Sequence, residues 1–312
     1  MDFETLKALD TTYLMQNDRR MPIALDHGKG AIVYDLENRP YIDFCTGIGA
    51  VGHGNDSWVE AIIDQALKLT QTTNLIYTEP VARLAERLCI RSGLAAACFT
   101  NSGIEANDTM IELARKYSFD RYGAGRNTIL TLKNGTHMSD IVEKADRDVC
   151  AVMLELVQEG IAPLSCDFVH SLAVLCAERD WLLLVDEVQT GMGRSGTLFA
   201  FQQYGILPDA VSFANGLAGG LPMGGILVNG RCRNSGHRRA NTSGGNPICA
   251  AAALTVLDFL DEQVLAEIKD KGNYMRAGVD VMQLSGLGAT SGLGLMVGIE
   301  VCGVRSHFEL MT

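Results

Sequence analysis

Several features that would place this 312-residue chain in a specialised class of protein are missing. Its nine cysteines contain no Cys-x-x-Cys pair and no metal-ligand spacing, so their scattered pattern predicts a reducing compartment. No uncharged apolar run approaches the roughly 18 residues that cross a bilayer. The first ten residues, MDFETLKALD, lack the basic-then-apolar order of a signal peptide. These absences predict a soluble, cytoplasmic protein.

A surplus of basic charge is also missing. The formal net charge of −11 argues against nucleic acid or an anionic membrane as the main partner. The charge does not identify a substrate, because a local basic pocket can exist on an acidic protein. The length predicts one large domain with a smaller one, and the sequence shows no internal repeat or low-complexity tract.

The stretch LLLVDEVQTGMG, residues 182–193, is the most informative part of the chain. Four apolar residues end abruptly in Asp186 and Glu187, as in a strand buried on both faces of a parallel sheet. Acidic residues at the carboxyl end of such a strand lie at the edge where open α/β folds bind ligands. The alternative is a strand that ends in solvated carboxylates.

Strands and helices alternate from residue 95 to residue 228, which predicts an α/β fold. The expected architecture is a mostly parallel sheet with helices on both faces. The expected helices include Ser57–Thr70, Glu79–Ser92 and a helix over residues 105–117, and the expected strands include residues 95–100, 150–156 and 209–213.

The segment NSGIEAND, residues 101–108, joins one of these strands to a helix. A strand, a tight turn with Ser102 and Gly103, and a helix start bring backbone N–H groups and the helix dipole to one point. That arrangement suits a phosphate, although an ordinary strand-to-helix turn would have the same pattern.

Four motifs in this order resemble the fold-type I, class III aminotransferases that use pyridoxal 5′-phosphate. These motifs are NSGIEAND, DEVQTGMGRSG, SFANGLAGGLPMGG and NTSGGNP, and within the family they look most like the acetylornithine and ornithine aminotransferases. The resemblance implies amino-group transfer from N-acetylornithine to 2-oxoglutarate, as in arginine biosynthesis, by a homodimer with shared active sites.

The resemblance also implies roles for particular residues. Asp186 would be the charge partner of the cofactor's protonated ring nitrogen, Val188 would pack on the ring, and Gln189 would bond its phenolic oxygen. The phosphate would be held by Ser102, Gly103 and Ile104 together with Thr242 of the neighbouring subunit. Glu155 would lie beneath the cofactor and the substrate, and Thr136 and His137 occupy the positions of a ring-stacking aromatic residue and the histidine after it.

The sequence departs from the family pattern most seriously at Asn215, where the family has the lysine that forms a Schiff base with the cofactor. An asparagine amide is neither a nucleophile nor a base for that chemistry. Thr136 replaces an aromatic residue, and Ser291 stands in place of a common arginine. The alternative to an active aminotransferase is therefore a non-catalytic scaffold that binds the cofactor non-covalently or not at all.

The resemblance predicts an N-terminal segment of a small domain over residues 1–45 and a large cofactor-binding domain over residues 46–260. Residues 261–312 would begin a second part of the small domain, which is shorter than in the family. No metal site is expected.

Overall fold

The structure of the protein is a computed structural model. It describes residues 1–17, 20–44, 50–132, 137–144, 146–158, 160–236, 243–283 and 286–301.

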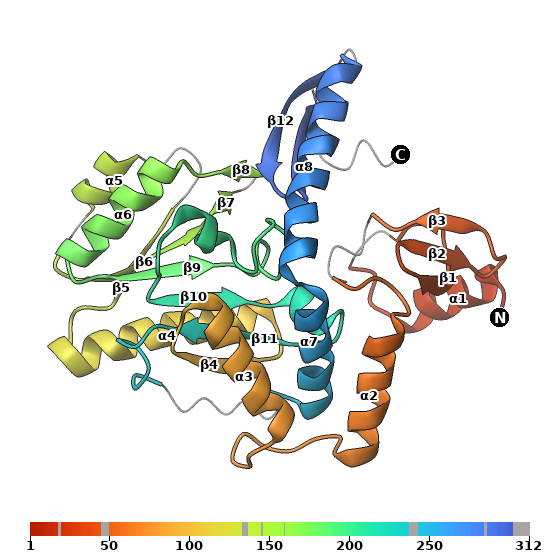
Figure 1. Cartoon of the computed structure of the whole chain (residues 1–312), viewed down its shortest axis with the longest axis horizontal. Coiled ribbons are helices and arrows are strands. Elements are labelled where there is room, and N and C mark those ends of the chain that lie inside the picture. Colours follow the sequence, from red (N-terminus) through yellow and green to blue (C-terminus); the bar gives the residue numbers. More distant parts are fainter. Residues whose placement is uncertain are drawn as a thin grey trace.

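The centre of the molecule is a six-stranded sheet in the order β4-β11-β10-β9-β6-β5 (Figure 1). Strand β11 runs antiparallel to both of its neighbours, whereas β10, β9, β6 and β5 are parallel to one another. Strand β4 consequently runs in the same direction as those four, so five carboxyl ends meet at one edge. The strands are β4 (Ala96–Thr100), β5 (Thr128–Thr131), β6 (Val149–Glu155), β9 (Leu182–Asp186), β10 (Ala210–Phe213) and β11 (Gly224–Val228).

The strands in the middle of this sheet are buried on both faces because their residues are apolar throughout. In β9, Leu183 and Val185 belong to one core cluster while Leu182 and Leu184 belong to the other. Alternate residues of a strand point to opposite faces, so an unbroken apolar run serves two hydrophobic layers.

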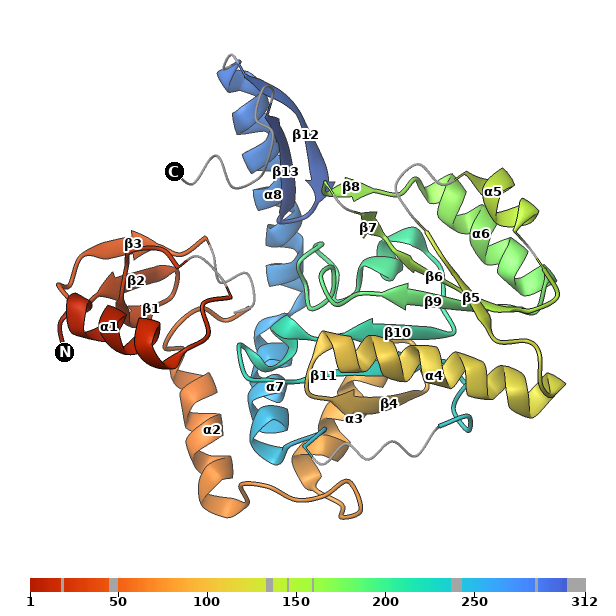
Figure 2. The ribbon, with the colours of Figure 1, turned by 180° about the vertical axis from the view of Figure 1, so that it is seen from behind.

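Helices cover both faces of the sheet (Figure 2). Helix α4 (Gly103–Tyr122) contributes Met110 and Leu113 to the smaller core cluster. Helices α3 (Glu79–Ser92), α6 (Cys166–Glu178) and α7 (Pro247–Phe259) contribute to the larger cluster on the other face. The predicted α/β fold, with a mostly parallel sheet between helices, is confirmed.

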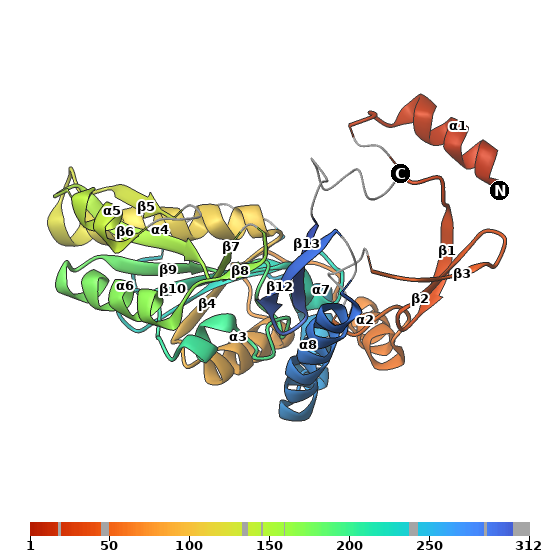
Figure 3. The ribbon, with the colours of Figure 1, turned by 90° about the horizontal axis from the view of Figure 1, so that it is seen from above.

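The remaining elements surround this sheet. At the N-terminal side, α1 (Phe3–Tyr13) and an antiparallel sheet of β1 (Leu25–Lys29), β2 (Ile32–Asp35) and β3 (Pro40–Ile42) lie to one side, and α2 (Asp56–Lys68) follows them (Figure 3). The other elements are α5 (Met138–Glu143), β7 (Val157–Gln158), β8 (Ala162–Pro163), η1 (Ala200–Tyr204), η2 (Asn215–Ala218), α8 (Glu262–Met282), β12 (Leu287–Leu293) and β13 (Met296–Val301). Among the described residues, no helix combines the length and the apolar character needed to cross a membrane.

Two predicted helix starts differ from the structure. Helix α2 begins at Asp56, because the side chain of Asn55 accepts a hydrogen bond from the backbone N–H of Trp58 at 3.0 Å and so caps the helix. The predicted cap, Ser57, lies inside its first turn. Helix α4 begins at Gly103 rather than at residue 105, since Ser102 caps it through the N–H of Glu105 at 3.2 Å.

Candidate active site

Several of the residues predicted to bind the cofactor lie at the edge where five strands have their carboxyl ends. Glu155 at the end of β6 is in register with Asp186 at the end of β9, and Asp186 is in register with Ser212 of β10. Strand β4 leads into the start of α4 at this edge, and β10 leads to Asn215. The fold therefore brings four separate parts of the sequence to one place.

Asp186 is held at this edge by three hydrogen-bond donors. Its Oδ2 accepts from Nδ2 of Asn107 at 2.6 Å, and its Oδ1 accepts from the N–H of Val188 at 2.9 Å and the hydroxyl of Ser212 at 3.3 Å. Hydrogen bonds to a charged acceptor are stronger than neutral ones, so they fix the orientation of this half-buried carboxylate.

Asn107 is also the source of an unsatisfied polar atom. Its Oδ1 is the one buried side-chain oxygen or nitrogen that has no hydrogen-bond partner within the described ranges. Buried polar groups are nearly always paired, so the cluster around Asp186 lacks one donor. A bound group that carries an N–H or O–H donor would satisfy this oxygen.

A second carboxyl group lies beside Asp186. Glu155 is exposed as a whole residue, but its carboxyl group is partly buried by protein atoms. This burial raises the pKa of Glu155, and the negative charge of Asp186 raises it further. The structure shows no ion pair to either carboxylate among the residues that it describes. Among the described residues, the negative charge of these two carboxylates is therefore not compensated by an ion pair.

The predicted anion site is the start of α4. Gly103 and Ile104 are its first two residues, and the first amides of a helix have no intrahelical acceptor. A Cβ atom at Gly103 would lie only 2.5 Å from Cγ1 of Val188. Glycine thus allows the helix start to approach the side chain of Val188, so the predicted anion site and the predicted ring-packing residue are neighbours.

Asn215 lies close to the same loop. Its φ of +55° is in the left-handed region, which asparagine tolerates better than most residues. Its Nδ2 donates to the carbonyl oxygen of Val188 at 3.2 Å. Gln189, one residue further, is exposed. The residue at the family's lysine position is therefore bonded to the loop that also carries Asp186.

Glu187, the second acidic residue of the predicted pair, does not face this edge. It is fully buried, and its carboxyl oxygens accept from the N–H groups of Ala200 and Phe201, both at 2.7 Å, and from the hydroxyl of Thr190 at 2.9 Å. Burial raises its pKa to about 7, against the lowering effect of these hydrogen bonds. Glu187 holds the first turn of η1 in place and is a residue of the core.

The remaining predicted residues are Thr136, His137 and Thr242. Thr136 and Thr242 lie outside the described residues. His137 precedes α5, where its backbone N–H donates to Asp140 at 2.8 Å and its side chain is exposed. In the described ranges, no three His, Cys, Asp or Glu side chains are placed to hold a metal ion.

Sequence reasoning missed two contributors, Asn107 and Ser212. Asn107 belongs to the NSGIEAND motif and follows Gly103 by one helical turn, so its position on the same helix face was available as a signal. Ser212 lies in the strand next to β9, and only the register of that pairing places it beside Asp186.

Comparisons with known proteins identify the family of the chain. The class-III aminotransferase family model matches residues 13–138 and 135–308. The acetylornithine aminotransferase of Haemophilus ducreyi is 38% identical to this chain, and the match covers 96% of this chain and 86% of that protein.

Two solved structures share the fold. The acetylornithine aminotransferase of Elizabethkingia anophelis has a TM-score of 0.89 and 27% identity, covering 96% of this chain and 85% of its own. The ornithine δ-aminotransferase of Plasmodium falciparum has a TM-score of 0.88 and 28% identity, covering 96% and 84%. The chain belongs to the class-III aminotransferase family, which confirms the resemblance inferred from the four motifs.

Proposed function

We propose that this chain carries an acetylornithine-type aminotransferase site that binds pyridoxal 5′-phosphate without a covalent link. The observation that carries the proposal is the convergence of Asn107, Ser212 and the Val188 amide on Asp186, beside the helix start at Gly103. A pyridine ring with a phosphate needs an anionic partner at one end and an anion site at the other, and this edge offers both.

Each part of the ligand has a group to hold it. Asp186 would bind the ring nitrogen, Val188 would pack on the ring, and Gln189 would bond the phenolic oxygen. The amides of Gly103 and Ile104, with Ser102, would bind the phosphate, and Thr242 of a second subunit would add to it. The bound cofactor supplies an electron sink for reactions at an amino-bearing carbon.

Asn215 is the reason to expect little turnover. Its amide cannot form the covalent link with the cofactor's aldehyde and cannot move a proton as a general base. General acid–base catalysis alone contributes roughly 10²–10⁴-fold, so transfer from N-acetylornithine to 2-oxoglutarate should be slower by several orders of magnitude. A non-catalytic, cofactor-binding scaffold is accordingly the second candidate, and Asn215 is the observation in its favour.

A homodimer in the cytoplasm is part of the proposal. Large apolar side chains are exposed at the end of α2, between α2 and α3, and at the start of α4, namely those of Leu67, Leu75, Ile76, Tyr77 and Ile104. Exposed apolar side chains of this kind are typical of a protein interface, and Ile104 belongs to the helix start proposed to bind the phosphate, which fits a site shared between two subunits.

The test uses the purified chain mixed with pyridoxal 5′-phosphate. We expect binding that is lost on dialysis and no cofactor attached to any peptide after borohydride reduction, as measured by mass spectrometry. The variant Asn215→Lys should retain the cofactor through dialysis and form glutamate from N-acetylornithine and 2-oxoglutarate. A reducible adduct in the unaltered chain, or turnover equal to that of the lysine variant, would contradict the proposal.

A further inference from the structure

Three elements bring oxygen acceptors to the carboxyl edge of the sheet, and no ion pair to its two carboxylates is found among the described residues. Glu155 and Asp186 end adjacent strands in register, and Asn215 contributes an amide from the end of β10. A ligand with one cationic group can neutralise only one carboxylate. A second positive charge on the ligand is favoured wherever such acceptors remain.

The orientation of the Asn215 amide follows from its hydrogen bond. The carbonyl oxygen of Val188, 3.2 Å away, can only accept, so the NH₂ group of Asn215 must face it. The Oδ1 atom consequently points away from that bond, and it has no hydrogen-bond partner among the described residues. Oδ1 can accept a hydrogen bond from an ammonium group but can only repel an aldehyde oxygen.

We infer that this site prefers the amine form of the cofactor, pyridoxamine 5′-phosphate, over forms with a neutral group at the same carbon. The inference rests on the proposed function, since it assumes that the ring binds at Asp186. Asn215 thereby acts as an acceptor for the ligand's ammonium group, in the position where the family places an amine of its own. Glu155 adds negative charge, and a nearby ammonium group would offset the repulsion that raises its pKa.

The experiment compares three ligands that share the ring and the phosphate. Pyridoxamine 5′-phosphate, pyridoxine 5′-phosphate and pyridoxal 5′-phosphate differ only in carrying an ammonium, a hydroxyl or an aldehyde group. Each ligand is titrated into the full chain at neutral pH, and binding is measured by calorimetry. The Kd of pyridoxamine 5′-phosphate should be at least about tenfold lower than that of pyridoxine 5′-phosphate. The readout is binding and needs no turnover.

Two variants of Asn215 test the assignment, and both accept its left-handed backbone. Asn215→Gly removes the amide and should reduce the amine-to-alcohol preference several-fold, while Asn215→Asp adds a charge and should increase it. Glu155→Gln should also reduce the preference. Circular dichroism of each variant confirms that it is folded.

The outcomes separate the inference from the proposed function. Equal affinity for the three ligands, or a preference unchanged in the glycine and aspartate variants, would overturn the inference and leave the proposed site intact. Failure of all three ligands to bind would refute both.

Discussion

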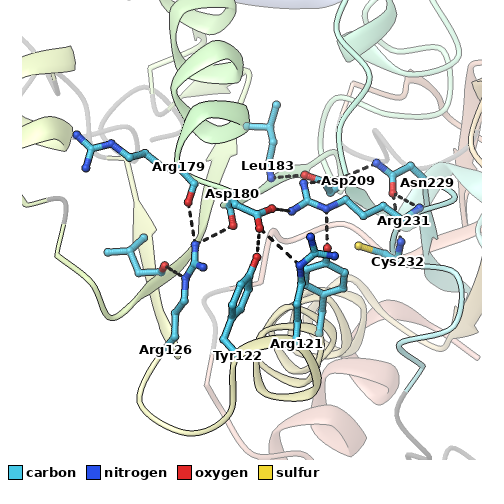
Figure 4. Close-up of polar contacts among 12 residues, drawn as sticks. Arg121, Tyr122, Arg126, Arg179, Asp180, Leu183, Asp209, Asn229, Arg231 and Cys232 are labelled. Carbon is cyan, nitrogen blue, oxygen red and sulfur yellow. Dashed lines mark hydrogen bonds and ion pairs between the residues drawn. The ribbon is translucent and has the colours of Figure 1, made fainter.

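The two ends of strand β9 carry an aspartate each, and their surroundings differ. Asp180, just before the strand, accepts hydrogen bonds from the hydroxyl of Tyr122 and the guanidinium of Arg231, and Arg121 lies 3.6 Å from it (Figure 4). Asp186, at the far end, is bonded to neutral donors alone among the described residues. Five residues separate the two aspartates, so an extended chain places them roughly 20 Å apart.

The cluster at the amino end satisfies its own groups (Figure 4). Asp209 accepts from the N–H of Leu183 and from Nδ2 of Asn229, both at 2.8 Å, and Arg231 lies 3.5 Å from it. Arg126 donates to the carbonyl oxygens of Arg179 and Asp180 at 2.9 and 2.8 Å. Both aspartates have an arginine partner here, so this end of the sheet has a structural role.

The carboxyl end has the opposite character. Its two carboxylates repel each other, and the oxygen of Asn107 is unpaired among the described residues. Natural proteins tolerate such unfavourable electrostatics mainly at functional sites. The amino end has more charged residues, but its aspartates are paired with arginines. What distinguishes the carboxyl end as the candidate ligand site is charge without a partner among the described residues.

The largest expected effect is a change of stability with pH. It concerns Glu187, which follows Asp186 in the chain but belongs to the core. Its pKa is about 7 in the folded protein and roughly 4.3 in the unfolded chain. The folded state therefore binds the proton more tightly, and the free energy of unfolding should fall by about 3 kcal/mol as the pH rises from about 4.5 to about 7.

Glu187→Gln removes this titration, and urea unfolding at several pH values measures it. The stability difference between the unaltered chain and the variant should change with pH in that window, even if the variant is less stable throughout because its amide has one acceptor in place of two. Asp180→Asn is the control for a carboxylate outside the core. Parallel pH curves for the unaltered chain and the glutamine variant would show that Glu187 does not titrate there.

The next effect is on ligand affinity. Asp186→Asn removes the charge that is proposed to face the ring nitrogen, and loss of a hydrogen bond to a charged group should raise the Kd for pyridoxamine 5′-phosphate by about 10- to 100-fold. Asp180→Asn, at the other end of the same strand, should leave this Kd nearly unchanged, since distant sites act independently. Calorimetry checks both variants, and an equal loss in the two would mean that Asp186 acts only through stability.

The sequence was sufficient to predict the elements whose local signals agree with their tertiary environment. Helix α3 has the predicted bounds because Pro80 lies in its first turn, an apolar stripe faces the core, and Gly93 ends it in a left-handed conformation. Strand β9 was recognisable because four apolar residues can be buried on both faces only in the interior of a sheet.

Other elements depend on contacts that are distant in sequence. Helix α8 contains two glycines, which lower helix propensity; a Cβ atom at Gly272 would lie 1.9 Å from the carbonyl oxygen of Gly294, so this glycine is required by packing. Strand β1 has no apolar alternation and forms only through its pairing with β2. The inward direction of Glu187 and the contact between Asn107 and Asp186 likewise required the assembled fold.

The smallest expected effect is on stability and concerns the close approach of Gly103, at the start of α4, to Val188. Gly103→Ala places a methyl group 2.5 Å from Cγ1 of Val188, and relief by rotation or a small backbone shift should cost about 1–2 kcal/mol of unfolding free energy. Val188→Ala in the same chain removes the opposing methyl groups, so the double variant should be less destabilised than the sum of the two single changes. Urea unfolding of the four proteins measures this coupling. A purely additive result would mean that the Val188 side chain already has room to move. In that case the close approach at Gly103 does not fix Val188 against the start of α4.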